Sequence, residues 1–158
     1  ILMIVGLSLS SYSKSKEVGE NIDVTHYEIH LNEINVADRI IDATTIITLK
    51  TLTSIDGIEL ELKSLDVTSV TSDDAIINNF SQNGDVLSVT FGNPVTANTT
   101  ISLTVNYGGT TFNENWGGIH WSNDYVYNLG VGFDSQPHNL GKTWFPCVDN
   151  FTDKASFD

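Results

Sequence analysis

Regular alternation of apolar and polar side chains is the feature that most limits what this chain can fold into. Residues 25–36 place two sets of side chains on opposite sides: Tyr27, Ile29 and Leu31 against His26, Glu28 and His30. A period of two over that length is typical of a strand with one buried face. We therefore expect a β-strand here, with the apolar set in the core.

Four further stretches show strand character. Residues 39–52 are rich in β-branched residues, which favour the pleated surface. Residues 55–65 alternate a buried set with an exposed one: Ile58, Leu60 and Leu62 against Glu59, Glu61 and Lys63. Residues 75–91 form two strand-like runs, and the Asn-Gly-Asp sequence at 83–85 between them predicts a hairpin turn. The last stretch, 99–109, has four apolar residues in register: Ile101, Leu103, Val105 and Tyr107.

No window of the sequence shows a helical repeat with caps, and short turns of Gly, Asn, Asp and Ser separate the expected strands. This pattern predicts an all-β fold, either an antiparallel β-sandwich or a saddle-like multi-stranded sheet. With 158 residues, the chain has the length of one domain with a substantial core.

The first residues need a separate interpretation. Residues 1–11 are apolar and then small, which is typical of the core of a secretory signal peptide and its exit site. The run is too short for a transmembrane helix. We therefore expect residues 1–20 to be a signal-peptide remnant and linker, residues 21–158 to be the folded domain, and the protein to be secreted, periplasmic or on the cell surface. A buried strand or a piece of a membrane anchor is the alternative.

Charge and chemistry exclude several classes of function. The formal net charge is −13, with only seven Lys and Arg, which disfavours nucleic-acid binding. The single cysteine, Cys147, excludes an internal disulfide and is expected to be a buried small apolar residue. His26 and His30 lie too far apart on a strand to share one ion. We assign no catalytic and no metal-binding residue within this chain.

The region after Gly109 differs in composition from the rest of the chain, because it holds all three tryptophans and many glycines. Such stretches tend to form ordered loops that carry function, although the aromatic side chains can equally pin a loop onto the sheet. One functional hypothesis is a secreted β-sandwich binding module, in which Trp116, Trp121 and Tyr125 form a stacking platform.

The C-terminal stretch contains Phe145-Pro146-Cys147 and then Asp149, followed by Lys154, Ala155 and Phe157. In this order and spacing it resembles the end of the N-terminal β domain of the zinc aminopeptidase N family, whose motif the first group matches and whose next strand the second group matches. Lys142 stands where the family usually has Arg, and Trp144 lies within the motif. We expect Trp144, Phe145 and Cys147 to be largely buried. Residues 26–31 resemble the family's opening strand, and residues 116–121 its Gly-Phe/Ile-Tyr segment. Asn150-Phe151 replaces the family's Glu-Pro.

The resemblance implies a parent protein in which this domain packs on a thermolysin-like catalytic domain further along the chain. That domain would carry the zinc and the His-Glu-x-x-His motif, and peptides would be the substrates. No cofactor is expected in the present chain, which would be inactive alone. A relative that kept the fold but lost the zinc site is the other alternative.

The family also implies a Gln or Glu that accepts hydrogen bonds from the substrate's ammonium group, a short distance before Phe-Pro-Cys. Counted without gaps, that position falls on Pro137, which cannot do this. Gln136 is one residue away and Asp134 is close. We therefore expect Gln136 and Asp134 to bind the substrate amine, because both side chains offer oxygen acceptors.

Overall fold

The computed structural model describes residues 17–123, 125–151 and 153–158. Within them, the chain forms strands with one short 3₁₀ helix, in this order: β1 (Ile22–Asn35), β2 (Ile40–Thr51), β3 (Ile55–Glu61), β4 (Asp66–Thr71), β5 (Ile77–Asn83), β6 (Val86–Val95), β7 (Thr100–Thr110), β8 (Asn113–Glu114), β9 (Gly117–Ser122), β10 (Tyr125–Asn128), η1 (Gly141–Thr143) and β11 (Ser156–Phe157). The predicted signal-peptide remnant lies outside the described residues as far as residue 16.

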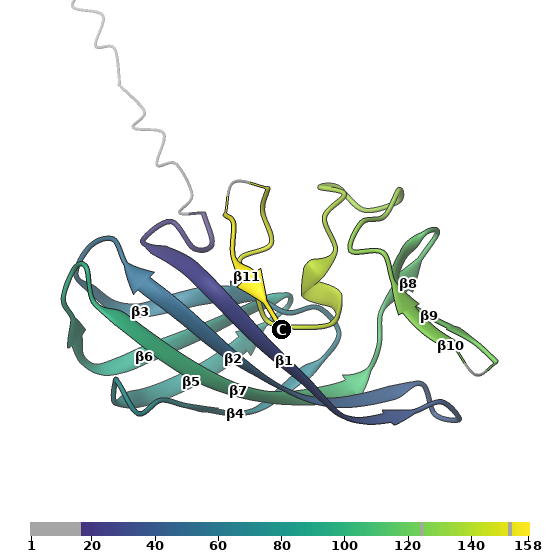
Figure 1. Ribbon diagram of the computed structural model, residues 1–158, viewed down its shortest axis with the longest axis horizontal. Helices are drawn as coiled ribbons and strands as arrows, with labels where there is room; N and C mark the ends of the chain where they lie inside the picture. Colours follow the sequence, from purple (N-terminus) through teal and green to yellow (C-terminus); the bar gives the residue numbers. More distant parts are fainter. Residues whose placement is uncertain (1–16, 124, 152) are drawn as a thin grey trace, which may run out of the picture.

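The strands form three sheets (Figure 1). The largest has the order β11-β1-β2-β7-β4, a second has the order β3-β6-β5, and a third has the order β10-β9-β8. Neighbouring strands are antiparallel, except that β11 is parallel to β1. The predicted all-β, antiparallel architecture is thus confirmed.

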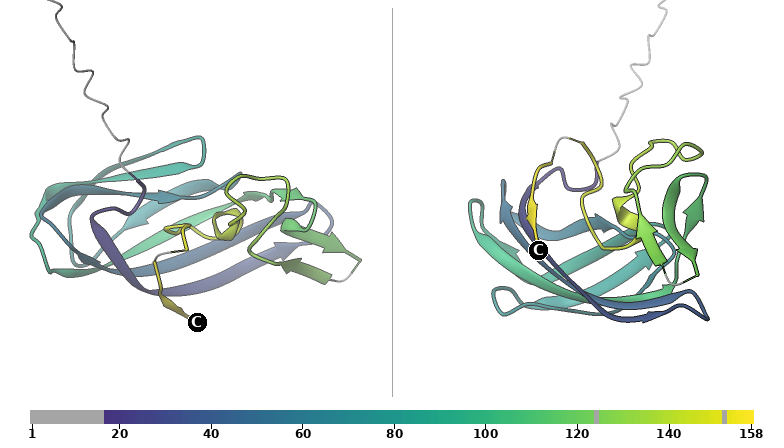
Figure 2. Two further views of the ribbon diagram at one scale, coloured as in Figure 1. Left: turned by 90° about the horizontal axis from the view of Figure 1, so that it is seen from above. Right: turned by 45° about the vertical axis from the view of Figure 1, so that its right-hand side comes forward.

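The first two sheets share one hydrophobic core, and the C-terminal segment lies between them and the β8–β10 sheet (Figure 2). The alternation in the sequence accounts for this core. On β7 the four predicted residues are all buried: Ile101, Leu103, Val105 and Tyr107. On β3 the predicted core residues Ile58 and Leu60 are buried, and so is Leu62 just beyond it.

The prediction of which β1 side chains face the core is only partly correct. Tyr27 is buried, but Ile29 is half-buried and Leu31 is 43% exposed. The register of β1 against β2 shifts between Val24 and His26, and again between Leu31 and Glu33. No shift lies between Tyr27 and Leu31, so these alternate side chains share one face of the strand. Leu31 is exposed because that face extends beyond the core, which includes Tyr27 and contacts Ile29 but does not reach Leu31.

The strand expected at residues 55–65 ends at Glu61, and its outer face is less exposed than predicted. Glu61 and Lys63 are half-buried. Lys63 pairs with Asp85 at 3.6 Å and lies over the ring of Phe112 at 4.3 Å. These contacts come from distant parts of the chain, so the local pattern could not reveal them.

The short elements agree with the sequence predictions only in part. The turn predicted at Asn83–Asp85 is confirmed, since it joins β5 and β6 in a hairpin. Strand β4 was not predicted, because its Thr and Ser residues weaken the alternation. The glycine- and aromatic-rich region expected as loops contains the β9–β10 hairpin.

None of the helical structure in the described residues is long and apolar enough to cross a membrane.

Candidate functional site

The motif segment, residues 141–149, is anchored to the end of β3 by backbone hydrogen bonds. Glu61 and Cys147 exchange two of them, with N···O distances of 2.7 and 3.0 Å. The N–H of Lys63 donates to the carbonyl of Lys142 at 2.7 Å. The segment therefore forms a short added edge of the β3 sheet, which fixes where the preceding loop ends.

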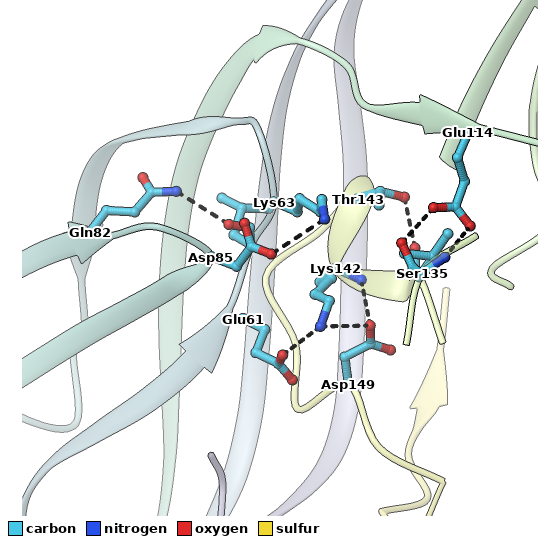
Figure 3. A network of polar contacts seen from close by, with 11 residues as sticks. Glu61, Lys63, Gln82, Asp85, Glu114, Ser135, Lys142, Thr143 and Asp149 are labelled. Atoms are coloured by element: carbon cyan, nitrogen blue, oxygen red, sulfur yellow. Dashed lines mark hydrogen bonds and ion pairs between the residues drawn. The ribbon is translucent and has the colours of Figure 1, made fainter. Parts of the chain in front are cut away.

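A small ionic cluster adds to this anchor (Figure 3). The ammonium of Lys142 donates to Glu61 Oε1 at 2.6 Å and lies 4.0 Å from Asp149 Oδ2. The Lys142 side chain is only 11% exposed. Burial favours the neutral amine, but the hydrogen bond and charge of Glu61 outweigh it and raise the pKa of Lys142. Lys142 thus stays charged and ties the motif to β3.

The apolar part of the motif is buried to different degrees. Cys147 and Pro146 are buried, and burial raises the pKa of the Cys147 thiol well above its ordinary value. The predicted inert, buried cysteine is confirmed. Trp144 and Phe145 were expected to be largely buried but are only half-buried, because they pack against the rim of the core. The Phe145 ring makes edge contacts with Tyr27 and Trp144, at centroid distances of 5.1 and 4.8 Å.

The strand expected over residues 154–157 is shorter than predicted. Only Ser156 and Phe157 pair with β1, and Lys154 is exposed. The ladder includes the next residue, since Asp158 donates to the carbonyl of Tyr27 and accepts from Ile29, both at 3.0 Å. The return of the chain to the sheet is therefore confirmed.

The loop that precedes the motif, residues 130–140, is closed at its base. Gly132 donates to the carbonyl of His138 at 2.8 Å, and Leu140 donates to that of Gly130 at 2.7 Å. A bridge between Val131 and Asn139 lies between these bonds. The loop therefore leaves and re-enters the protein at adjacent points, and its tip is residues 133–137.

Glu114, on strand β8, holds the tip of this loop (Figure 3). Its Oε1 accepts the backbone N–H groups of Asp134 and Ser135, both at 3.1 Å. Its Oε2 accepts the Ser135 hydroxyl at 2.5 Å. The hydrogen bond from the Ser135 side chain, helped by those from the two backbone groups, lowers the pKa of the Glu114 carboxyl.

The backbone around Glu114 leaves room for its side chain. A Cβ at Gly132 would collide with Glu114 Oε1 and with Leu140, and a Cβ at Gly117 would come within 3.0 Å of Glu114 Cγ. Two glycines therefore make room for this contact. Sequence reasoning missed Glu114, since β8 is two residues long and Ser135 is 21 positions away.

The two residues predicted to bind an amine both lie at the loop tip and are both exposed. Asp134 Oδ2 accepts the N–H of Asn115 at 3.4 Å. The side-chain nitrogen of Gln136 contacts His138 Nε2 at 3.1 Å, which leaves its amide oxygen as the acceptor for a ligand. The loop thus presents a carboxylate and an amide to solvent from a fixed base.

The proposed aromatic platform is not a single exposed surface. Trp116 and Tyr125 are 67% and 74% exposed. Trp121 instead packs on the core and donates from Nε1 to Thr111 Oγ1 at 2.9 Å. The prediction that Trp121 belongs to an exposed stacking platform with Trp116 and Tyr125 is therefore wrong.

In the described part of the chain, no three His, Cys, Asp or Glu side chains are close enough together to hold a metal ion. His26 contacts Ser156 Oγ at 2.8 Å, His30 contacts Glu28 at 2.9 Å, and His120 stacks on Tyr127. These three contacts are those of surface and packing histidines.

Comparison with known proteins finds one family and a set of similar structures. Residues 23–158 match the family described as peptidase M1 N-terminal domain. No curated protein matches the chain.

Among solved structures, the M1 zinc metallopeptidase from Deinococcus radiodurans is similar, with a TM-score of 0.73 and 23% identity over 89% of this chain. A mutant of that enzyme bound to a Tyr-Ser-Ala substrate matches equally well. A two-domain M1 zinc metallopeptidase mutant bound to L-arginine has a TM-score of 0.71 and 23% identity over 87% of this chain. The present chain spans 32% of each of these proteins. At this identity, the likeness shows a shared fold.

Proposed function

Since this chain belongs to the peptidase M1 N-terminal domain family, we propose that it is the substrate-cleft and scaffold domain of a secreted zinc aminopeptidase. In this proposal residues 21–158 form the domain, and residues 1–20 are the remnant of the export signal with a linker. The parent protein removes N-terminal residues from peptides, and the present chain binds the substrate's free amine without carrying out the cleavage.

The observation that carries this proposal is the loop held by Glu114. A substrate ammonium needs oxygen acceptors at a fixed position, and charged acceptors bind it more strongly than neutral ones. Asp134 and Gln136 supply one of each, on a tip fastened by three hydrogen bonds to Glu114. The ionic cluster of Lys142 fixes the far end of the same segment.

Zinc and its ligands belong, in this proposal, to the part of the parent protein beyond this chain, where the family resemblance places them. When bound, the metal would polarise the scissile carbonyl and lower the pKa of a bound water. The role of the present chain is limited to binding and orienting the substrate's amino end.

The test uses the parent protein and the Gln136→Ala variant. We expect the parent to cleave aminoacyl reporters and to lose that activity on treatment with a chelator. Gln136→Ala should raise KM for free-amine substrates about tenfold, the cost of one charge-assisted hydrogen bond. Asp134→Asn should act in the same direction, because it removes a charge that attracts the ammonium.

Gln82→Ala is a matched control, since that side-chain amide donates to the carbonyl of Leu65 at 2.7 Å, away from the loop. It should leave KM unchanged. Unchanged kinetics for Gln136→Ala would clear Gln136 of the proposed role. An equal loss on amine-blocked ligands would show that the side chain serves packing instead.

A further inference from the structure

Trp116 has a backbone conformation that a bulky residue rarely adopts. It is the second residue of the two-residue turn that joins β8 to β9, since Glu114 pairs with Gly117 on either side of that turn. Its φ is +63°. Gly or Asn normally fills such a turn position, because the left-handed region brings the Cβ of other residues too close to the following carbonyl oxygen. Among the described residues, Trp116 is the only aromatic residue with a positive φ.

Packing does not account for this conformation. Trp121 and Trp144 pack against the core, whereas Trp116 is 67% exposed. A glycine would adopt the same backbone without strain, so stability alone favours glycine at this position. Strained residues of this kind cluster at functional sites, where the surrounding structure holds them in place. The indole of Trp116 therefore calls for a role outside the fold.

The two residues before Trp116 both bind the loop tip. The carboxylate of Glu114 accepts the N–H of Asp134 at 3.1 Å, close to the hydrogen bonds with Ser135 drawn in Figure 3. The N–H of Asn115 donates to Asp134 Oδ2 at 3.4 Å. Consecutive Cα atoms are about 3.8 Å apart, so Trp116 begins one residue away from a direct contact with the Asp134 carboxylate. Its ring is within reach of a group bound at the loop tip.

The structure of an N-terminal residue sets what a ring at this place can bind. The ammonium group and the first side chain of a peptide are attached to the same Cα atom. Acceptors that hold the ammonium therefore hold the first side chain close by. An exposed indole offers a large apolar face, which favours apolar and aromatic partners through burial of surface and ring contacts.

We infer that Trp116 is a specificity residue for the first side chain of the substrate and favours aromatic and large aliphatic side chains over small ones, an inference that rests on the proposed function. In this role the indole packs beside that side chain while Asp134 and Gln136 accept hydrogen bonds from the ammonium. The positive φ is retained because it holds the indole in solvent beside the loop tip. A glycine there would remove the strain and leave the side chain of the substrate without its partner.

The first experiment measures kcat/KM of the parent protein for the 4-nitroanilides of L-phenylalanine and L-alanine. Trp116→Ala and Trp116→Gly should each lower the phenylalanine-to-alanine ratio about tenfold, mainly through KM. Trp116→Phe keeps an aromatic ring and should hold the ratio within about twofold of the unaltered protein. Phe151→Ala is the control, at a 73% exposed aromatic residue of the C-terminal segment, and should leave the ratio unchanged. An unchanged ratio for Trp116→Ala, or an equal loss on both reporters, would overturn the inference.

The same variants separate the ring from the backbone. Trp116→Ala keeps a residue that is strained at positive φ, whereas Trp116→Gly relieves that strain. Trp116→Gly should therefore raise Tm by a few degrees above that of Trp116→Ala, although both lose the same specificity. A Tm of Trp116→Gly below that of the unaltered chain would show that the indole serves the fold, and would count against the inference.

A third measurement tests contact without catalysis. Hydroxyl-radical oxidation of Trp116 in the parent protein is followed by mass spectrometry with and without L-phenylalanine. L-Phenylalanine should slow the oxidation, and L-alanine should slow it less. Slow oxidation in the absence of any amino acid would show that another part of the parent covers Trp116, and would overturn the inference.

These outcomes are separable from the fate of the proposed function. An active aminopeptidase in which Gln136→Ala raises KM but the Trp116 variants keep the ratio would retain the proposed function and reject the role of Trp116. A parent that cleaves no aminoacyl reporter would reject the proposed function. Protection of Trp116 by L-phenylalanine would then still support an aromatic-binding role, and its absence would refute that role.

Discussion

At the scale of single residues, Glu114 does more to position the candidate site than any residue that was predicted from the sequence. Its carboxylate accepts three hydrogen bonds from the loop tip, and two glycines leave space for it. A carboxylate that accepts these hydrogen bonds orders the loop but does not itself contact a ligand. We therefore regard Glu114 as a positioning residue for Asp134 and Gln136.

Replacement of Glu114 separates positioning from direct binding. In the parent protein of the proposed function, Glu114→Ala should speed hydrogen exchange at the Asp134 and Ser135 amides and raise KM for free-amine substrates about tenfold, because misplaced groups lose binding. Glu114→Gln keeps an oxygen acceptor. It should therefore retain most of the protection of the two amides and a KM close to that of the unaltered protein. If Glu114→Gln were as damaging as Glu114→Ala, the charge itself would be what matters, and Glu114 would contact the ammonium directly.

Phe145 allows a stability prediction. A fully buried Phe replaced by Ala costs about 3–5 kcal/mol, but Phe145 is only half-buried and packs edge-on against Tyr27 and Trp144. We expect Phe145→Ala to lower the free energy of unfolding by about 2–3 kcal/mol in urea denaturation. Phe151→Ala, at a 73% exposed position, should change it little. An unchanged midpoint for Phe145→Ala would show that the motif contributes nothing to the core.

Prediction from sequence succeeded at this scale where burial is local. Cys147 was assigned correctly because a lone cysteine without a nearby base is normally buried. Glu114 and Lys63 were not, because their partners lie in distant segments. The burial of Leu31 was predicted wrongly, because the apolar pattern does not show where the strand extends beyond the core.

At the scale of elements, the turns decide where the short strands can form. Gly84 closes the β5–β6 hairpin with φ of +59° and open space around it, whereas Gly118 has φ of +74° and its would-be Cβ collides with the carbonyl oxygen of Phe112. Both positions need the left-handed backbone that glycine adopts most readily. Only the second is also a close approach of two strands.

This difference predicts unequal costs for the same substitution. Gly84→Ala should lower the free energy of unfolding by about 1 kcal/mol through backbone strain alone. Gly118→Ala should cost about 3 kcal/mol or more, since the clash has to displace β8. Urea denaturation of the two variants checks this, and equal losses would contradict the packing of β8 on β9.

The long strands were predictable because each carries its own period. The β9–β10 hairpin was not, because its strands are short and its glycines suggested loops. Strand β4 was not predicted because its Thr and Ser residues weaken the apolar alternation.

At the scale of the whole molecule, the net charge of −13 sets a general condition for stability. Such a charge destabilises the compact state through self-repulsion, and salt screens it. Raising sodium chloride from about 20 to 200 mM should therefore increase Tm by a few degrees. A falling Tm would show that ion pairs such as Lys142 with Glu61 outweigh the repulsion.

The pairing of β11 with β1 has a consequence for synthesis of the protein on the ribosome. His26 and Ser156, which touch through their side chains, are 130 positions apart in the chain, and β1 has no other partner on that edge among the described strands. Contacts of such long range slow folding. A nascent chain can therefore complete this sheet only after residues 156–158 have left the exit tunnel, so β1 waits with an open edge until nearly the whole domain has been synthesised.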